Sequence, residues 1–371
     1  MIQKSEITDL TICRAFFAAW VFTYHVDLYL RFSDWLGPFG GLIRRGYLGV
    51  DGFFILSGLI LALVHPELAT RTHLINLKEG LQVKPLRGRD ALIFWAKRLA
   101  RIYPVHFAVL LIFGAILLAG LANGVTPREP ARFALPALFQ NVVLVQGWGF
   151  ASQGAWNYPS WSVSTEWAGY LLFPLLWFAI TYFERYVAPQ MILIAFVVIG
   201  LIMTWHHNMN LTFSEGLIRF FPEFIIGMST TRAIPYVADS QNLRRAALAG
   251  GIAFTVIFVV AGIDLISIFG IWLFLSACLM QADAHCPPLF RAPILRWLGQ
   301  LSYAFYMSFA LAELLITQWF RKQGWAPPSH GFIFFFGMLL ITFCVACVLH
   351  VVIEVPCRRR ADRWLASFSA T

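Results

Sequence analysis

The sequence predicts an all-α membrane protein with about ten transmembrane helices, and three observations support this fold class. The 371 residues are 59% hydrophobic, and their mean hydropathy is +0.70. Only 13% of them are charged, whereas a soluble domain carries roughly 25%. Several apolar stretches reach the ~20 residues that a helix needs to cross a bilayer. We therefore expect a polytopic protein with a single membrane domain over residues 1–371 and no fused extracytoplasmic domain.

The first apolar stretch covers about 9–30 and is expected to be a permanent helix, because no small-residue cleavage site follows it. Nine further stretches follow, and the longest polar segments between them are 66–100 and 123–161. Phe133–Gln146 is apolar but short for a span, so we expect it to be re-entrant or interfacial. The ten expected helices cover about 9–30, 46–65, 101–122, 162–183, 190–207, 214–232, 246–262, 264–281, 298–319 and 331–353.

Lys and Arg are distributed unevenly over the two sides of this arrangement. With the N-terminus inside, 19 of the 28 Lys and Arg residues lie on the inner side and 7 on the outer side. Because basic loops stay in the cytoplasm, this bias predicts that both termini are cytoplasmic, as in a multi-pass protein of the bacterial inner membrane. Topology then accounts for the formal net charge of +9, and no nucleic-acid partner is expected.

The six cysteines fall in or beside the apolar stretches and have no metal-ligand spacing. We expect them to be apolar packing residues rather than a disulfide framework, and we expect no metal site. They are Cys13, Cys278, Cys286, Cys344, Cys347 and Cys357.

The first expected helix carries Arg14 and His25 in the stretch LTICRAFFAAWVFTYHVDLY. Ionisable groups inside hydrocarbon are expensive, and they usually mark functional sites. Their spacing places both on one helix face, about 16.5 Å apart along the axis. His25 is therefore a candidate catalytic residue and Arg14 a candidate donor-binding residue. Two structural alternatives stay open: a packed histidine, and an arginine that neutralises a carboxylate.

Four further ionisable residues are expected at the depth of His25, in the outer half of the membrane. Two of them are carboxylates that could orient the histidine, and the other two could bind substrate. Each has a structural alternative. The first carboxylate could cap a helix or form an ion pair, and the second could hold a loop. The other two residues could form an internal ion pair, because they are at positions i and i+4. The two carboxylates are Asp51 and Glu166, and the two candidates for substrate binding are Arg219 and Glu223.

A basic cluster, FWAKRLARIYP, precedes the third expected helix on the inner side. Basic groups at a helix entrance suit phosphates, and arginine binds them in a bidentate manner. The cluster could equally serve only to set the topology, and its tyrosine could be an interfacial anchor. The candidate donor-binding residues are Lys97, Arg98, Arg101 and Tyr103.

Trp161 and Ser164 lie in the block WSVSTEWAGYLLFP, where the fourth expected helix begins. Both are candidates for substrate or donor binding. Trp161 could stack on a sugar ring, or it could belong to an aromatic belt at the membrane interface.

Together these residues suggest a route for group transfer across the membrane. A phosphorylated donor would dock at the inner basic cluster, and its long arm would pass Arg14 toward His25. The axial separation of about 16.5 Å is comparable to an extended pantetheine arm. An imidazole titrates near neutral pH, which suits a general base acting on a hydroxyl from the outer side.

Seven blocks of the sequence resemble, in order, those of membrane acyltransferase family 3. The resemblance implies ten or so helices and transfer of an acyl group, usually acetyl, from cytoplasmic acyl-CoA. The implied acceptor is a hydroxyl of a surface glycan, such as an exopolysaccharide or O-antigen, or of its lipid-linked precursor. It further implies that Arg14 and His25 are essential. Glu166, Arg219 and Glu223 fall in motifs implicated in function. The blocks are CRAFFAAWVFTYH, GVDGFFILSG, FWAKRLARIYP, WSVSTEWAGYLLFP, RFFPEFIIG, LGQLSYAFYMS and VVIEVPCRR.

Two positions depart from the family pattern. Trp167 stands where many members have a second acidic residue, and Phe309 stands where many have a histidine, which argues against a mechanism with two histidines. Some relatives carry a fused extracytoplasmic esterase-like domain. Since this chain ends soon after the tenth expected helix, we expect it to complete transfer alone or with a separate partner, such as a polysaccharide-assembly protein.

The sequence therefore predicts a membrane-bound O-acyltransferase that takes acetyl-CoA or another acyl-CoA as donor and uses no metal. His25 would act as general base or as acyl carrier. Buried carboxylates, arginine and histidine also occur in proton-coupled transporters, so a transporter or exporter of a glycan stays open as an alternative. Acylation of a small secreted molecule is a further alternative.

Overall fold

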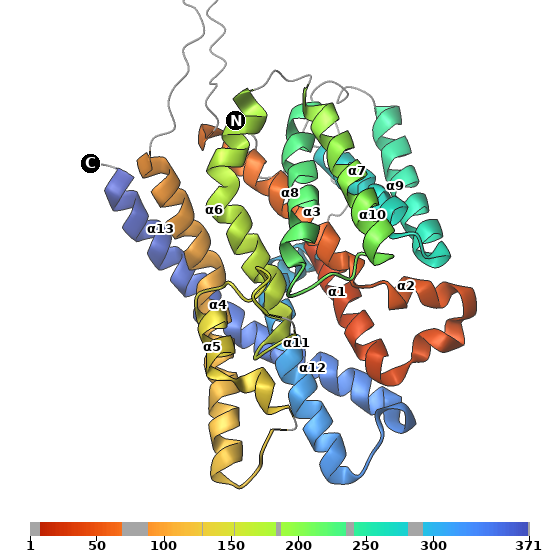
Figure 1. Ribbon diagram of the computed structural model, residues 1–371, viewed down its shortest axis with the longest axis vertical. Helices are drawn as coiled ribbons and strands as arrows, with labels where there is room; N and C mark the ends of the chain where they lie inside the picture. Colours follow the sequence, from red (N-terminus) through yellow and green to blue (C-terminus); the bar gives the residue numbers. More distant parts are fainter. Residues whose placement is uncertain are drawn as a thin grey trace, which may run out of the picture.

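The secondary-structure elements in the part of the chain that the computed structural model describes are all helices. This part comprises residues 8–68, 88–127, 129–151, 153–182, 187–234, 241–280 and 292–369, and it contains no strand. A helix lies over each of the ten ranges expected from the sequence (Figure 1). The predicted all-α fold class is therefore confirmed.

Most helices begin and end within a few residues of the expected positions. The main exception is α4, Gly88–Ala122, which begins well before the expected start at about residue 101. Its first turns mix exposed and buried positions, so a search for long apolar stretches does not detect them. The other nine are α1 (Thr8–Leu30), α3 (Leu48–Val64), α6 (Trp161–Tyr182), α7 (Val187–His206), α8 (Gly216–Ala233), α9 (Gln241–Ala261), α10 (Asp264–Leu279), α11 (Pro293–Gln323) and α12 (Gly331–Leu349).

Shorter elements connect these helices. A π-helix over His350–Glu354 joins α12 to α13, Val355–Ser369, and a 3-10 turn over Tyr158–Ser160 leads into α6. π-Helical turns are rare and are often found at functional sites. Two short α-helices, α2 (Gly41–Arg44) and α5 (Leu135–Val142), and further 3-10 turns complete the connections among the described residues.

Among the described residues, six helical segments are long and apolar enough to cross a membrane by length and composition. This finding supports a multi-pass membrane protein, whereas the full count of ten spans stays a prediction. α1 and α8 fall outside the six, and both carry buried charged residues that interrupt their apolar character, such as Asp27 and Arg219. The six segments are Phe32–Val64, Gly88–Ala122, Tyr158–Tyr182, Val187–His206, Gln241–Ala261 and Pro327–Ser367.

The helix α1 lies between two other helices and organises the packing. It contacts α3 on one side and α11 on another, while α3 packs along α8 and α11 packs along α12. α9 pairs with α10, and α13 lies beside α4 at the left of the molecule (Figure 1). The candidate residues on α1, α3, α4, α6 and α8 are thereby brought to neighbouring helices.

The contact between α3 and α8 is unusually close because each helix places a glycine against the other's backbone. A Cβ on Gly227 would lie 2.0 Å from the carbonyl oxygen of Ile55, and one on Gly58 would lie 2.1 Å from that of Phe224. Small residues allow such close helix packing inside a membrane. The charged residues of these two helices are consequently held at a fixed separation.

The apolar stretch Phe133–Gln146 contains only the short helix α5. Eight helical residues rise ~12 Å, much less than the ~30 Å thickness of the hydrocarbon core. His106 of α4 contacts this stretch, because its Nε2 lies 2.8 Å from the backbone oxygen of Asn141. The stretch is therefore anchored to α4 and does not form a spanning helix.

Some residues used in the sequence analysis lie outside the described part of the chain. The five cysteines that the structure describes are free thiols, and the Sγ atoms of Cys13 and Cys278 lie 3.9 Å apart. Outside the described residues are one cysteine and several of the basic residues behind the expected orientation: Cys286, Lys4, Arg71, Lys78, Lys84, Arg87, Arg128, Arg185 and Arg291.

Candidate active site

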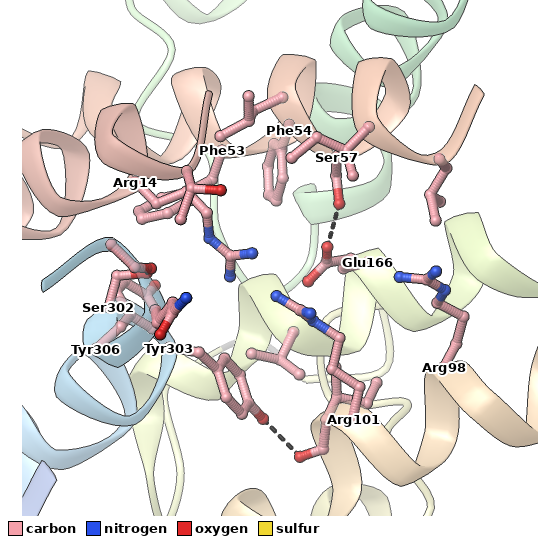
Figure 2. Close-up of a pocket in the computed structure, with 18 of the residues that line it drawn as sticks. Arg14, Phe53, Phe54, Ser57, Arg98, Arg101, Glu166, Ser302, Tyr303 and Tyr306 are labelled. Carbon is pink, nitrogen blue, oxygen red and sulfur yellow. Dashed lines mark hydrogen bonds between the residues drawn. The ribbon is translucent and has the colours of Figure 1, made fainter. Parts of the chain in front are cut away.

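A cavity of about 390 Å³ lies between α1, α3, α4, α6 and α11, next to the junction of α12 and α13. Apolar side chains of α3 form one wall, and charged or hydroxyl-bearing side chains from the other helices form the rest (Figure 2). Five arginines face only two glutamates, so the cavity suits a ligand with several negative charges. The charged lining residues are Arg14, Arg98, Arg101, Arg296, Arg358, Glu166 and Glu354.

Two of these arginines are directed into the middle of the cavity. Figure 2 shows the guanidinium groups of Arg14 and Arg101 turned toward the carboxylate of Glu166. The Nε atom of Arg14 is buried and has no hydrogen-bond partner among the described residues. The charges of Arg14 and Arg101 also repel each other. A bound anion would supply the missing hydrogen bonds and reduce this repulsion.

Glu166 provides a counter-charge inside the cavity. Its Oε1 atom accepts hydrogen bonds from the hydroxyl of Ser57 on α3 and from that of Tyr170, the latter at 2.7 Å. These bonds fix the carboxylate and link α3 to α6. Its charge acts on the neighbouring arginines, including Arg14. Glu166 therefore joins the arginine cavity and not the surroundings of His25, where the sequence analysis expected it.

Arg98 is held more firmly than Arg14. Its guanidinium carbon lies 5.6 Å from the ring centre of Phe94 and 6.0 Å from that of Tyr170. Its Nη2 atom lies 2.6 Å from Nε2 of His65, which can accept this hydrogen bond when its ring is neutral. Arg98 is thus positioned by aromatic faces and a histidine, with its charge toward the cavity.

His25 does not line this cavity and belongs to a separate cluster on the same helix. Its Nδ1 atom lies 3.1 Å from the hydroxyl of Tyr158, and its ring centre lies 4.6 Å from that of Phe309. The hydrogen bonds recorded for Asp51 and Glu166 go to other groups. The expectation that one of these carboxylates orients His25 is therefore corrected: the described contact of its ring nitrogen is Tyr158.

Aromatic rings separate the cavity from His25. Phe53 and Tyr306 line the cavity and lie 6.2 Å apart between ring centres. Tyr306 lies 5.5 Å from Phe309, which in turn stacks against His25. Tyr306 is fixed by its hydroxyl, which donates to the backbone oxygen of Pro159 at 3.1 Å. We refer to Phe53, Tyr306 and Phe309 as the aromatic layer.

Asp51, Arg219 and Glu223 form a buried charged cluster between α3 and α8. The Nε atom of Arg219 donates to Asp51 Oδ1 at 3.1 Å, and Nη2 bonds the second oxygen, which makes the pair bidentate. The backbone oxygens of Tyr47 and Leu211 accept the remaining bonds at 2.9 and 3.1 Å. The sequence analysis expected Asp51 to orient His25, and Arg219 and Glu223 to bind substrate. The bonds between Asp51 and Arg219 are instead of the kind that holds two helices together.

The remaining candidates lie outside the cavity. Lys97 is exposed, and Tyr103 stacks on Phe107 with ring centres 5.7 Å apart. Trp161 is buried, and its ring lies 5.6 Å from the guanidinium carbon of Arg219. Ser164 holds a loop, because its hydroxyl donates to the backbone oxygen of Leu144 at 2.8 Å. Trp161 therefore packs inside the helix bundle and not in an aromatic belt at the membrane interface, and Ser164 has a structural contact with a loop.

Several residues of the two clusters were not identified from the sequence. Glu354 and Arg358 line the cavity from the π-helix and α13, and the block VVIEVPCRR could have indicated them. Tyr158 contacts His25, and Glu313 contacts Tyr158. No sequence pattern links these residues to His25, because they come from parts of the chain that only the fold brings together.

A protein-family model, described as an acyltransferase domain, matches residues 7–351. Among curated proteins, acyltransferase MdmB of Streptomyces mycarofaciens is 26% identical over 402 residues, covering 96% of this chain and 93% of that protein. No solved structure matches the chain significantly.

Two proteins of Staphylococcus aureus are also similar, and both are longer than this chain. The "Putative O-acetyltransferase" of strain MRSA252 is 23% identical over 401 residues, covering 96% of this chain and 58% of that protein. The O-acetyltransferase OatA of strain NCTC 8325 is 26% identical over 220 residues, covering 56% of this chain and 31% of that protein.

Proposed function

This chain belongs to the acyltransferase domain family, which makes it an O-acyl-transferring enzyme, and we propose that its donor is cytoplasmic acyl-CoA and its acceptor a glycan hydroxyl. The acyl group in this proposal is acetyl, as the names of the staphylococcal relatives indicate for those proteins. The acceptor is a surface glycan or its lipid-linked precursor at the outer face of the bacterial inner membrane. Acylation at that face requires that the acyl group pass through the membrane domain.

The observation that carries the donor proposal is the excess of arginine in the cavity. Coenzyme A carries a pyrophosphate and a further phosphate, and arginine suits such groups by charge and by bidentate hydrogen bonding. The buried Nε atom of Arg14 has no hydrogen-bond partner among the described residues, and Arg101 lines the same cavity, so both guanidinium groups could bind phosphate oxygens. Arg296 and Arg358 extend the positive charge toward the starts of α11 and α13.

The position of His25 on the same helix carries the proposed route. Arg14 and His25 lie on one face of α1, about 16.5 Å apart along the axis. A pantetheine arm is long enough to bring a thioester from the arginine cavity toward the imidazole. Rings of the aromatic layer stand between the two clusters. Rotation of Tyr306 and Phe309 is therefore part of the proposed reaction cycle.

In the proposed reaction, His25 acts as a general base. Its imidazole takes the proton of the acceptor hydroxyl while the hydroxyl oxygen bonds to the acyl carbonyl carbon. The bond between that carbon and the CoA sulfur then breaks, and the imidazolium returns the proton to the sulfur. If His25 instead carries the acyl group, a wild-type sample quenched after mixing with [14C]acetyl-CoA retains label that His25→Gln does not.

Calorimetric titration tests the donor proposal without knowledge of the acceptor. Purified protein in detergent would be titrated with acetyl-CoA, CoA and dephospho-CoA. We expect acetyl-CoA to bind wild type, and Arg14→Gln to bind it about 10-fold more weakly, which corresponds to 1.4 kcal/mol. Arg321→Gln is the matched control, because Arg321 is exposed and bonds only to Gln318 among the contacts described for it. Absence of binding by folded wild type would refute acyl-CoA as donor.

The acceptor is tested separately in cells. Deletion of the gene should remove ester-linked acyl groups from one surface glycan, as measured by proton NMR of the purified polysaccharide. Restoration by wild type but not by His25→Ala would support the proposal. If all glycans keep their esters and a secreted small molecule loses one instead, the acceptor half of the proposal is wrong and the acyl-CoA half stands.

A further inference from the structure

We propose that Glu313 and Tyr158 form a positioning relay for His25, in which the carboxylate orients the phenol and the phenol fixes the protonation of the imidazole. The inference rests on the proposed role of His25 as a general base. The sequence analysis assigned neither residue a role beside His25. They come from α11 and from the 3-10 turn before α6, and they meet His25 of α1 in space.

The hydrogen-bond geometry of this cluster is well defined. The hydroxyl of Tyr158 donates to Oε2 of Glu313 at 2.6 Å. The same hydroxyl oxygen lies 3.1 Å from Nδ1 of His25. The second carboxylate oxygen, Oε1, accepts a hydrogen bond from the hydroxyl of Tyr29 at 2.6 Å. Both oxygens of Glu313 therefore act as acceptors, as expected for an ionised carboxylate.

The number of protons available in this row of hydrogen bonds assigns the tautomer of His25. A phenol has one hydroxyl proton, and Tyr158 uses it in the hydrogen bond that it donates to Glu313. Its oxygen can then only accept at His25, so Nδ1 must carry the proton of the neutral imidazole. The lone pair is consequently on Nε2, which is the atom that can take a proton from an acceptor hydroxyl. A base held in one tautomer by a carboxylate follows the logic of hydrolase triads, here with a phenol between the two groups.

Two neighbours support this arrangement. The ring of Phe309 stacks on His25 at 4.6 Å with an interplanar angle of 35°, which restricts rotation of the imidazole. The guanidinium carbon of Arg132 lies 5.7 Å from the ring centre of Tyr158, so this arginine packs against the phenol of the relay. The relay itself exchanges no proton with the substrate: Tyr158 and Glu313 keep their states while Nε2 gains and then loses one.

The tautomer of His25 is the most direct test. Protein with 15N-labelled histidine would be studied by NMR in lipid nanodiscs, and the His25 signal would be assigned by its loss in His25→Gln, since the chain has nine histidines. We expect wild type to show the Nδ1–H tautomer. Tyr158→Phe, which keeps the ring and removes only the hydroxyl, should lose this preference. An Nε2–H tautomer in wild type, or no change in Tyr158→Phe, would overturn the relay.

Tyr24→Phe is the matched control. The ring of Tyr24 also lies beside His25, with ring centres 5.1 Å apart. Its hydroxyl accepts a hydrogen bond from Asn210 at 3.3 Å instead of contacting the imidazole. Removal of this hydroxyl should leave the tautomer as in wild type. A change of equal size in Tyr24→Phe and Tyr158→Phe would show a general effect of packing and refute a specific relay.

Turnover provides the second readout. Tyr158→Phe and Glu313→Gln should lower kcat about 10-fold or more, because a general base that is in the wrong tautomer contributes little of its usual 10²–10⁴-fold. The Kd for acetyl-CoA should not change, since neither residue lines the cavity. Tyr29→Phe should have a smaller effect, because it removes a bond from the other oxygen of Glu313.

The two readouts separate the relay from the proposed function. If wild type does not transfer an acyl group from acetyl-CoA, the proposed function fails, while the tautomer still decides whether the relay exists. If wild type transfers the group and Tyr158→Phe keeps full kcat, the relay is wrong and the proposed function stands.

Discussion

Arg219 and Arg14 both lie inside the helix bundle beside carboxylates, yet the donors of their guanidinium groups are used very differently. Arg219 is fully buried, and Asp51 together with two backbone oxygens accepts its hydrogen bonds. Arg14 faces a cavity, and its buried Nε has no partner among the described residues. An arginine whose bonds are complete holds helices together, whereas one whose bonds are incomplete is available to a ligand. The residue type alone does not distinguish these roles.

The largest expected effect is on the stability of the protein, when the buried charged cluster of Asp51, Arg219 and Glu223 is disrupted. Arg219→Gln leaves the buried carboxylate of Asp51 without its partner, and breaking such a pair costs about 3–5 kcal/mol of the free energy of unfolding. The thermal unfolding midpoint of the solubilised protein, followed by tryptophan fluorescence, should fall clearly. The double variant Arg219→Gln with Asp51→Asn should recover part of the loss. An unchanged midpoint in the single variant would contradict a structural role for Arg219.

The close contact of α3 and α8 around that cluster should be almost as sensitive. Gly227→Ala places a methyl group 2.0 Å from the carbonyl oxygen of Ile55, so the helices must separate. Overpacking of this kind costs about 1–3 kcal/mol. Gly250→Ala on α9 is the matched control, because no atom lies within 4 Å of the added carbon. Equal unfolding midpoints for the two variants would show that the contact is not tight.

In the arginine cavity, replacing an arginine with glutamine should lower the affinity for the donor and not the stability of the protein. Arg101→Gln removes one of two mutually repelling charges, so the unfolding midpoint should not fall. The affinity for acetyl-CoA should decrease about 10-fold, since a hydrogen bond to a charged group contributes roughly 1.5–3 kcal/mol. Calorimetry and thermal unfolding on the same preparation check both halves. A fall in the midpoint without loss of affinity would place Arg101 with Arg219 as a structural residue.

The smallest expected effect concerns the counter-charge of the cavity. Glu166→Gln keeps groups that can bond Ser57 and Tyr170 but removes a negative charge from beside the arginines. Acetyl-CoA should bind about threefold more tightly, because repulsion of its phosphates decreases by an amount typical of partly screened charges. Glu129→Gln, at an exposed position, should leave the Kd unchanged. Weaker binding by Glu166→Gln would mean that the carboxylate serves mainly to hold the arginines in place.

The positions of the helices could largely be predicted from the sequence, since long apolar stretches have few alternatives in a bilayer. The early start of α4 at Gly88 was missed because its first turns are amphipathic and not apolar. Arg14, Arg98 and Arg101 were selected as candidate donor-binding residues, and all three line the cavity, whereas Glu166 was expected beside His25 and lines the cavity instead. They were selected by residue type and estimated depth alone.

Depth along a helix does not determine which neighbour a side chain faces. Asp51 was expected beside His25 because the two residues have a similar depth, but the packing of α3 against α8 turns it toward Arg219. Tyr158 meets Glu313 across 155 residues of sequence, and neither position carries a local pattern. Such contacts depend on helix rotation and neighbourhood, which are set by the packing of the whole bundle.

The aromatic layer of Phe53, Tyr306 and Phe309 has a consequence for the energy balance of the cell. A continuous water path through the protein would let protons run down the membrane potential, and each elementary charge releases about 2.3 kcal/mol per 100 mV. The layer places carbon rings between the arginine cavity and the histidine. In the proposed cycle, an acyl group would pass these rings once per turnover while the rings hinder the passage of ions. The proposed route would then transfer a chemical group between two compartments without connecting them electrically.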